Sequence, residues 1–109
     1  MQVIKTPLEG VLVIEPKVFK DSRGFFVETY NEERYMQAGI TARFVQDNMS
    51  ASTYGVVRGL HFQRPPYTQA KLVSCIEGEV LDVAVDLRKA SPTYGQWYSV
   101  VLSAENHRQ

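Results

Sequence analysis

Apolar and polar residues alternate along most of this chain, in short runs that turn residues separate. The runs are QVIK, GVLVIEP, GFFVETY, ARFVQDNMSAS, VVRGLHFQ, AKLVSCI, EVLDVAVDLR and QWYSVVLS. Such alternation is typical of β-strands with one buried face, and the clusters of Gly, Pro, Asp and Ser between the runs favour turns. Many short strands with regular turns predict an all-β domain, either a sandwich or a jelly-roll barrel.

One stretch, residues 31–38, has the pattern of a short helix instead. Asn31 is a suitable N-cap, acidic residues fill the first turn, and Gly39 follows the last one. We expect a single helix there in an otherwise β-type chain.

The turn Glu77-Gly78 predicts a hairpin, because a two-residue turn with glycine second fixes the register of its flanking strands. In that register Lys71 lies opposite Ala84. One face of the hairpin is ordinary apolar core, and the other is mixed. The mixed face carries Lys71, Val73, Cys75, Val80, Asp82, Ala84 and Asp86. This face either meets solvent or lines the inside of a barrel around a ligand, with Asp82 or Asp86 holding Lys71. The pattern leaves both interpretations open.

Composition narrows the class of protein. With 109 residues, 44% hydrophobic and 22% charged, the chain is expected to form one globular domain over residues 1–109. Its formal net charge is zero, so we expect neither a nucleic acid nor a membrane surface as partner, and an anionic ligand needs a local cluster of cations. The single cysteine, Cys75, and the lack of a long apolar run predict a cytoplasmic protein.

His61 is one of only two histidines and lies in a predicted strand. A histidine in a strand is often a hydrogen-bonded structural residue, and it is also the side chain best suited to proton transfer near neutral pH. Strict alternation puts Arg58 on the opposite face from His61. Gly59 between them favours a bulge that would bring both side chains to one site.

Several blocks of the sequence together resemble the dTDP-4-dehydrorhamnose 3,5-epimerase family. They are DSRGFFVE (residues 21–28), FVQDNMSAS (44–52), GVVRGLHFQ (55–63), QAKLVSCIEGEVLDVAVDLRKASPTYGQW (69–97) and LSAENHRQ (102–109). The resemblance runs over nearly the whole chain with the blocks in order. It implies a cupin-type jelly-roll barrel, usually a homodimer, that acts on a dTDP-sugar in dTDP-rhamnose and polysaccharide biosynthesis without a cofactor.

The resemblance also implies roles for individual residues. His61 matches the general base, and Lys71 matches the residue beside the C4 carbonyl of the sugar. The positions that match nucleotide- and substrate-binding residues are Arg23, Glu28, Gln46, Asp47, Asn48, Arg58 and Lys71. The chemistry fits these residue types: removing a proton at C3 or C5 gives an enolate with its charge on the C4 oxygen, which a neighbouring cation stabilises. Guanidinium groups suit the diphosphate.

The chain departs from the family where it stops, at AENHRQ. Members of the family continue through further strands, which carry the tyrosine acid and the carboxylate that orients the histidine. We therefore expect an incomplete barrel and a catalytic set that lacks its acid. The alternatives are a non-catalytic fragment that binds nucleotide sugars and, more remotely, a metal-dependent cupin. Such metal sites need several histidines, and here His107 is the only imidazole besides His61.

Overall fold

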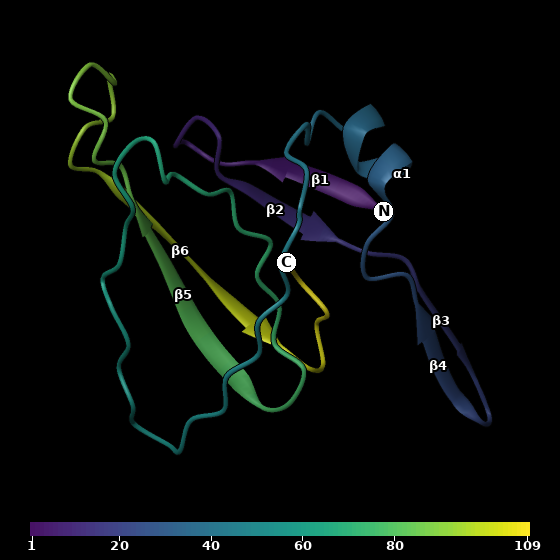
Figure 1. The fold of residues 1–109 in the computed structure, drawn as a ribbon. Helices are drawn as coiled ribbons and strands as arrows, with labels where there is room; N and C mark the ends of the chain where they lie inside the picture. Colours follow the sequence, from purple (N-terminus) through teal and green to yellow (C-terminus); the bar gives the residue numbers. More distant parts are fainter.

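The computed structural model describes residues 1–109 as mostly β structure with one short helix, which confirms the predicted class. Three antiparallel strand pairs, β1–β2, β3–β4 and β5–β6, account for all of its sheets (Figure 1). The elements are β1 (Gln2–Lys5), β2 (Leu12–Glu15), β3 (Val18–Asp21), β4 (Gly24–Val27), α1 (Glu32–Gln37), β5 (Glu79–Val85) and β6 (Trp97–Ser103). The helix is neither long nor apolar enough to cross a membrane.

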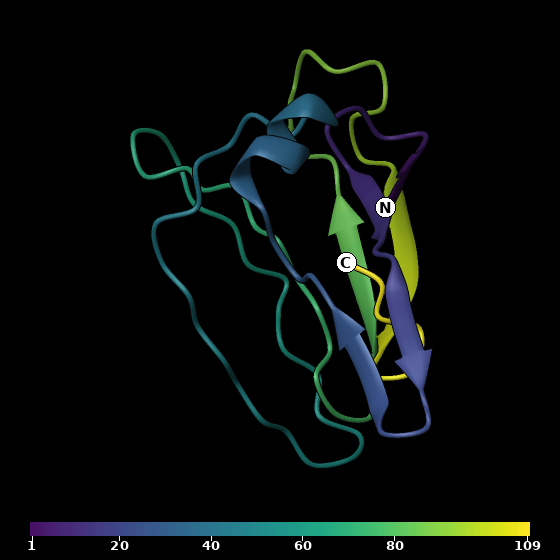
Figure 2. The same cartoon turned by 90° about the vertical axis from the view of Figure 1, so that its right-hand side faces the viewer.

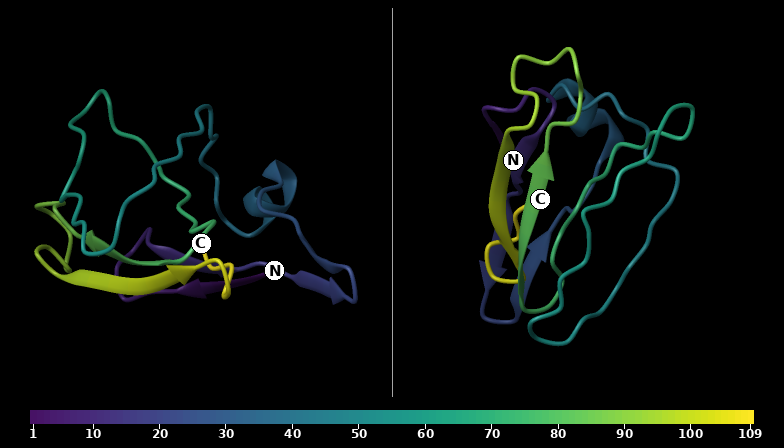
Figure 3. Two further views of the ribbon diagram at one scale, coloured as in Figure 1. Left: turned by 90° about the horizontal axis from the view of Figure 1, so that it is seen from below. Right: turned by 90° about the vertical axis from the view of Figure 1, so that its left-hand side faces the viewer.

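The three strand pairs lie in one layer, and the β3–β4 hairpin projects from one end of it (Figures 1 and 2). Residues 41–77, which we call the arch, leave this layer and pass over one side of it before the chain returns at β5 (Figure 3). The molecule measures 50 × 37 × 26 Å along its principal axes. The arch and the β3–β4 hairpin therefore occupy opposite ends of an elongated body.

The first hairpin owes its shape to Thr6. The Thr6 hydroxyl donates to the carbonyl oxygen of Val11 at 2.8 Å and accepts from the amide of Leu8 at 3.2 Å. Gly10 adopts φ +85°, a conformation that residues with a Cβ avoid. The turn brings β1 and β2 together, and Val13 and Ile14 of β2 are both buried.

Helix α1 begins and ends as its sequence predicts. The Asn31 side chain accepts from the Arg34 amide at 3.0 Å, and the chain leaves the helix through Gly39 at φ +89°. The helix buries one residue completely, Tyr35.

Tyr35 and the last residue of the chain hold one another in place. The Tyr35 hydroxyl donates to Oε1 of Gln109 at 2.6 Å, and Nε2 of Gln109 donates to the carbonyl oxygen of Thr29 at 2.7 Å. The backbone of Gln109 exchanges two hydrogen bonds with Ile14, of 2.8 and 2.9 Å. Burial raises the pKa of the Tyr35 phenol, and the charge of Glu28 raises it further, so the hydroxyl remains a donor.

The strands predicted within residues 42–76 are not formed. Across the arch the only backbone hydrogen bonds are two local turns, from Val56 to Thr53 and from Tyr67 to Arg64. A strand exists only where a neighbouring strand exchanges hydrogen bonds with it, and this chain brings no such neighbour alongside the arch.

The predicted hairpin around Glu77-Gly78 is wrong for the same reason. The chain does turn there, with Gly78 at φ +71°, but no backbone hydrogen bond joins residues 69–76 to β5. Strand β5 pairs with β6 instead, so that Asp82 lies opposite Val100 and Ala84 opposite Tyr98.

Replacing the Tyr35 hydroxyl tests the anchoring of the chain end. We expect Tyr35→Phe to lower the free energy of unfolding by about 1 kcal/mol, because Oε1 of Gln109 loses its donor in a partly buried site. Urea unfolding followed by circular dichroism measures this change. Tyr30→Phe is the matched control, since the Tyr30 hydroxyl forms no hydrogen bond in the structure and is half-exposed. Equal effects of both substitutions would contradict the anchoring role.

Candidate functional site

Arg23 lies at the tip of the β3–β4 hairpin. The turn between the strands places Gly24 at φ +138°, and the Asp21 carboxylate accepts from the Arg23 amide at 2.8 Å. The same carboxylate binds the Arg23 guanidinium at 2.6 Å, and this contact lowers the pKa of Asp21. The Arg23 side chain is 87% exposed, so its guanidinium retains donors that face solvent.

Glu28 follows the hairpin and is held by the helix. One terminal nitrogen of Arg34 donates to both of its carboxylate oxygens, at 3.0 and 3.2 Å. The Asn31 cap fixes the first turn of α1 and so directs Arg34 toward this carboxylate. Sequence reasoning identified Glu28 but missed Arg34 as its partner, although the six-residue spacing across a helix N-terminus is compatible with such a pair.

The other candidate residues all lie on the arch, and all are exposed: Gln46, Asp47, Asn48, Arg58, His61 and Lys71. Arg58 is the one whose position a hydrogen bond fixes. Its guanidinium donates to the Ser52 hydroxyl at 2.9 Å and to the carbonyl oxygen of Ala51 at 3.1 Å. These bonds fold residues 51–58 into a local loop.

The structure divides the candidates into two groups. Arg23 and Glu28 belong to the hairpin end of the molecule, whereas the rest belong to the arch (Figure 1). No hydrogen bond or ion pair joins one candidate to another. Nor does any cluster of three or more His, Cys, Asp or Glu side chains have an arrangement that could hold a metal ion.

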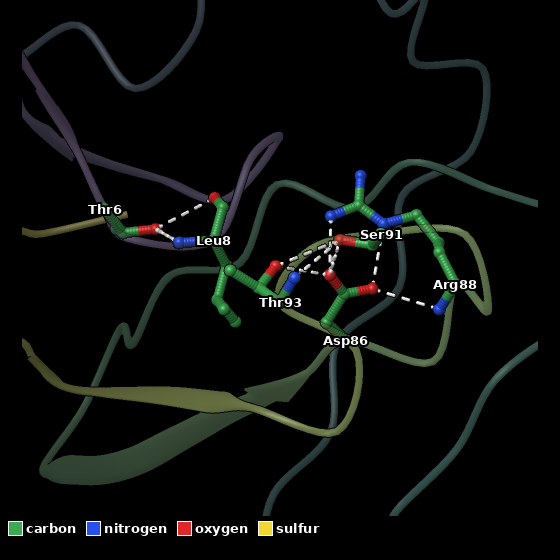
Figure 4. Close-up of polar contacts among 6 residues, drawn as sticks. All are labelled: Thr6, Leu8, Asp86, Arg88, Ser91 and Thr93. Carbon is green, nitrogen blue, oxygen red and sulfur yellow. Dashed lines mark hydrogen bonds and ion pairs between the residues drawn. The ribbon is translucent and has the colours of Figure 1, made fainter.

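Asp86 was one of two predicted partners of Lys71, and this expectation is wrong. Its side chain is 1% exposed and is fully engaged at the end of β5 (Figure 4). The Arg88 guanidinium donates to both carboxylate oxygens at 2.9 Å, and the hydroxyls of Ser91 and Thr93 donate at 2.5 and 2.7 Å. These donors, Arg88 first, hold the pKa of Asp86 far below its usual range. Asp82, the other proposed partner, forms no ion pair with Lys71 either.

The Asp86 cluster organises the loop between β5 and β6. The Asp86 amide and carbonyl pair with Gln96 and Gly95 at 2.9 and 2.7 Å, which closes the base of the loop. Residues 85–88 line a shallow groove together with residues 8–11, so this end of β5 lies beside the first turn. Sequence reasoning missed Ser91 and Thr93. Their short spacing from Asp86 is the signal that could have found them, because Ser and Thr readily bond a nearby carboxylate in a turn.

Comparison with known proteins defines the class of this domain. The family model for dTDP-4-dehydrorhamnose 3,5-epimerase matches residues 5–109. A curated epimerase from Shigella flexneri is 60% identical over the whole chain, which covers 61% of that relative. The solved Bacillus anthracis epimerase, with TDP and PPi bound, superposes with a TM-score of 0.95 and 49% identity over 99% of this chain and 62% of its own.

A second similar solved structure contains a bound sugar nucleotide. The Legionella pneumophila 3,5-epimerase, solved in complex with dTDP-4-keto-L-rhamnose, has a TM-score of 0.93 and 55% identity over 99% of this chain and 57% of its own. The chain thus spans about three-fifths of the length of these relatives. The fold is the cupin-type jelly roll of a nucleotide-sugar epimerase, present here in part. More specifically, the chain belongs to the dTDP-4-dehydrorhamnose 3,5-epimerase family.

The Asp86 cluster predicts an acid-dependent loss of stability. A carboxylate with a lowered pKa in the folded state contributes its full stability above its unfolded pKa of about 3.9 and loses it as the pH falls below that value. We expect thermal unfolding of the parent chain to shift down between about pH 6 and pH 3 by more than that of Asp86→Asn. At the upper pH the variant should be the less stable of the two.

The control for this comparison is Asp82→Asn, which changes a carboxylate within β5, four residues before Asp86, that forms no ion pair. It should retain the acid dependence of the parent. Asp86→Asn and the parent showing the same pH dependence would contradict the assignment of the cluster.

Proposed function

We propose that this chain takes part in epimerisation at C3 and C5 of dTDP-4-dehydro-6-deoxyglucose, the reaction that gives dTDP-4-dehydrorhamnose. The observation that carries this proposal is its 55% identity, over 99% of its length, to an enzyme solved with dTDP-4-keto-L-rhamnose. The reaction class is an isomerisation that needs no cofactor. The proposed place of action is the cytoplasm, where nucleotide sugars are made.

His61 is proposed as the general base. A neutral imidazole accepts a proton near neutral pH, and the protons at C3 and C5 are acidic because each flanks the C4 ketone. The negative charge that develops falls on the C4 oxygen. Lys71, in the same arch, is proposed to stabilise that oxygen with its ammonium group.

The remaining candidates are proposed to hold the nucleotide. Arg23 and Arg58 have the guanidinium geometry that matches diphosphate oxygens. Gln46, Asp47 and Asn48 offer amide and carboxylate groups on one exposed stretch of the arch, and Glu28 is already oriented by Arg34. The hydrogen bonds that hold Arg58 leave other guanidinium donors for a ligand.

A general base alone allows the hydrogen at C3 or C5 to exchange with solvent, but it cannot invert the configuration of that carbon. Removing a proton and returning one from solvent to the same face of the sugar replaces hydrogen by deuterium without changing the stereochemistry. Inversion needs an acid on the opposite face of the sugar, and none of the residues proposed above is assigned that role. A second candidate function is therefore binding of the nucleotide sugar with little turnover.

The experiment is incubation of the purified chain with the 4-keto sugar nucleotide in heavy water, followed by NMR. We expect tight binding of dTDP and deuterium at C3 or C5 that accumulates faster than the inverted product. His61→Ala should abolish deuterium incorporation while leaving the dissociation constant for dTDP within about twofold, because a base that touches only the sugar contributes little to nucleotide binding.

The control is His107→Gln, which changes the other histidine. The centroids of the His107 and Phe25 rings are 4.8 Å apart, and Gln keeps a planar polar group against Phe25. It should exchange deuterium like the parent. Incorporation at the parental rate in His61→Ala would overturn the assignment of the base. Full epimerase turnover by the parent would overturn the expectation that binding exceeds turnover.

We also propose that the chain forms a homodimer through the β3–β4 hairpin. The hairpin projects from the layer and exposes Phe19, Phe25 and Phe26, and it carries Arg23 far from the arch (Figure 1). A second protomer that receives this hairpin would cover those rings and bring Arg23 to the arch of its neighbour.

Light scattering tests the dimer. At micromolar concentration we expect a dimer or a higher oligomer. Phe26→Asp, which places a charge on the hairpin, should reduce the mean mass toward that of a monomer. Tyr94→Asp changes a similarly exposed ring outside the hairpin and serves as the control. A parent chain that stays monomeric would refute this proposal.

A further inference from the structure

An aromatic contact holds the beginning of the arch to the rest of the molecule. The rings of Tyr30 and Phe44 meet edge to face, with their centroids 5.4 Å apart and their planes at 87°. Aromatic pairs favour this arrangement because the positive edge of one ring lies over the negative face of the other. No backbone hydrogen bond and no ion pair involves residues 41–50. The ring contact therefore does the work at this end of the arch that a backbone ladder does elsewhere.

Phe44 differs in its burial from the other large apolar side chains nearby. Val45 and Met49 are each 83% exposed and Tyr54 is fully exposed, whereas Phe44 is partly buried. A ring withdraws from water only where other side chains cover it, and Tyr30 is an aromatic residue that does so here. The contact thus sets the position of Phe44 relative to the body of the protein.

Helix α1 holds Tyr30 in turn. The buried ring of Tyr35 packs against Tyr30, with 5.0 Å between the centroids and 73° between the planes. The same helix directs the chain into the arch, since the Ile40 amide donates to the carbonyl oxygen of Tyr35 at 2.9 Å. Tyr30 therefore lies between a buried ring of the helix and the first ring of the arch.

Both sides of this contact lie next to residues that we propose to bind the nucleotide. Glu28 precedes Tyr30 by two residues, and Gln46 follows Phe44 by two. Because each residue extends a chain by at most about 3.6 Å, each lies within about 7 Å of its neighbour in the contact, measured between Cα atoms. Arg34 of the helix holds the Glu28 carboxylate at 3.0 and 3.2 Å. The helix therefore orients Glu28 directly, and it orients the stretch that begins at Gln46 through Tyr30.

We propose that Tyr30 is a positioning residue of the nucleotide site. Its ring joins Phe44 to α1 and so sets the distance between Glu28 and the polar residues 46–48, which then meet one nucleotide together. Without the ring, the arch keeps these polar groups but has to order them on binding, and that ordering lowers the affinity. The inference rests on the nucleotide-binding roles proposed above for Glu28 and residues 46–48, and it assigns Tyr30 no contact with the ligand.

The test compares Tyr30→Leu with Tyr30→Phe. Leucine removes the edge-to-face contact and keeps an apolar side chain, whereas phenylalanine keeps the ring and removes only the hydroxyl. We expect the dissociation constant for dTDP, measured by calorimetry, to rise about threefold to tenfold in Tyr30→Leu, which is the range that an aromatic pair contributes. Tyr30→Phe should restore the dissociation constant to within about twofold of the parent value.

Two further measurements separate positioning from a general loss of structure. With the 4-keto sugar nucleotide at saturation, deuterium incorporation should proceed at the parental rate in Tyr30→Leu, because the lost contact affects binding and not the base. In the free chain, the backbone NMR order parameters of residues 44–48 should fall in Tyr30→Leu to the range of flexible backbone, below about 0.6. Those of β5 and β6 should stay at the parental values.

A double-mutant cycle with Phe44→Leu assigns the effect to this contact. Either substitution removes the contact, so the double variant should bind dTDP no more weakly than the weaker of the two single variants. Phe44→Leu also carries the test if Tyr30→Leu does not fold, because Phe44 lies outside the helix and the strands. The matched control is Tyr54→Leu, which removes a fully exposed ring of the arch and should bind dTDP like the parent.

The positioning role would be overturned by parental affinity in both Tyr30→Leu and Phe44→Leu. Additive losses in the double variant, or unchanged order parameters of residues 44–48, would overturn it as well. A parent chain that does not bind dTDP would overturn the proposed function, and this inference with it. A parent that binds dTDP while Tyr30→Leu binds equally well would leave the proposed function intact and overturn the positioning role alone.

Discussion

The pairing of extended backbone is the constraint on which this structure depends. Each strand that forms has a neighbour that donates and accepts its hydrogen bonds: β1 has β2, β3 has β4, and β5 has β6. Each segment without a neighbour remains irregular, even where its residues favour strands. Gln109 lies beside β2 through a reciprocal backbone pair with Ile14, and its side chain adds bonds to Tyr35 and Thr29. Alternating apolar and polar side chains favour a strand, but the strand forms only where a neighbouring strand exchanges hydrogen bonds with it.

This constraint explains which features the sequence could predict. The Asn31 cap and Gly39 define α1 by contacts within a few residues, and the alternation of residues 79–85 marks β5 correctly. The strand that pairs with β5 could not be predicted in this way. Alternation shows which side chains share a face of a strand, but not which strand lies beside it. The turn at Glu77-Gly78 suggested residues 69–76, whereas the ladder forms with residues 97–103, whose register fits β5 along its full length.

The same distinction applies to side-chain contacts: those between residues close in sequence were easier to predict than those between distant residues. The resemblance to the family nominated Arg23, Glu28, Arg58, His61 and Lys71 as candidates, but a matching block does not specify what each residue contacts in this chain. The contacts that exist are local ones, such as Glu28 with Arg34 and Arg58 with Ser52. Asp86 was one of two candidate partners of Lys71, through a register that is not formed. Its true partners lie within seven residues along the chain.

Catalysis would also depend on whether the backbone of the arch is paired. A base and an electrophile act on one substrate only when their separation is fixed to within a fraction of an ångström. His61 and Lys71 both lie on the arch, where no backbone ladder fixes one relative to the other. Strands paired along residues 55–73 would set their spacing and facing together, in the way that β5 and β6 set that of Asp82 and Val100. For the proposed base His61 and the proposed cation Lys71, pairing the backbone of the arch and fixing the distance between the two side chains would therefore be one event.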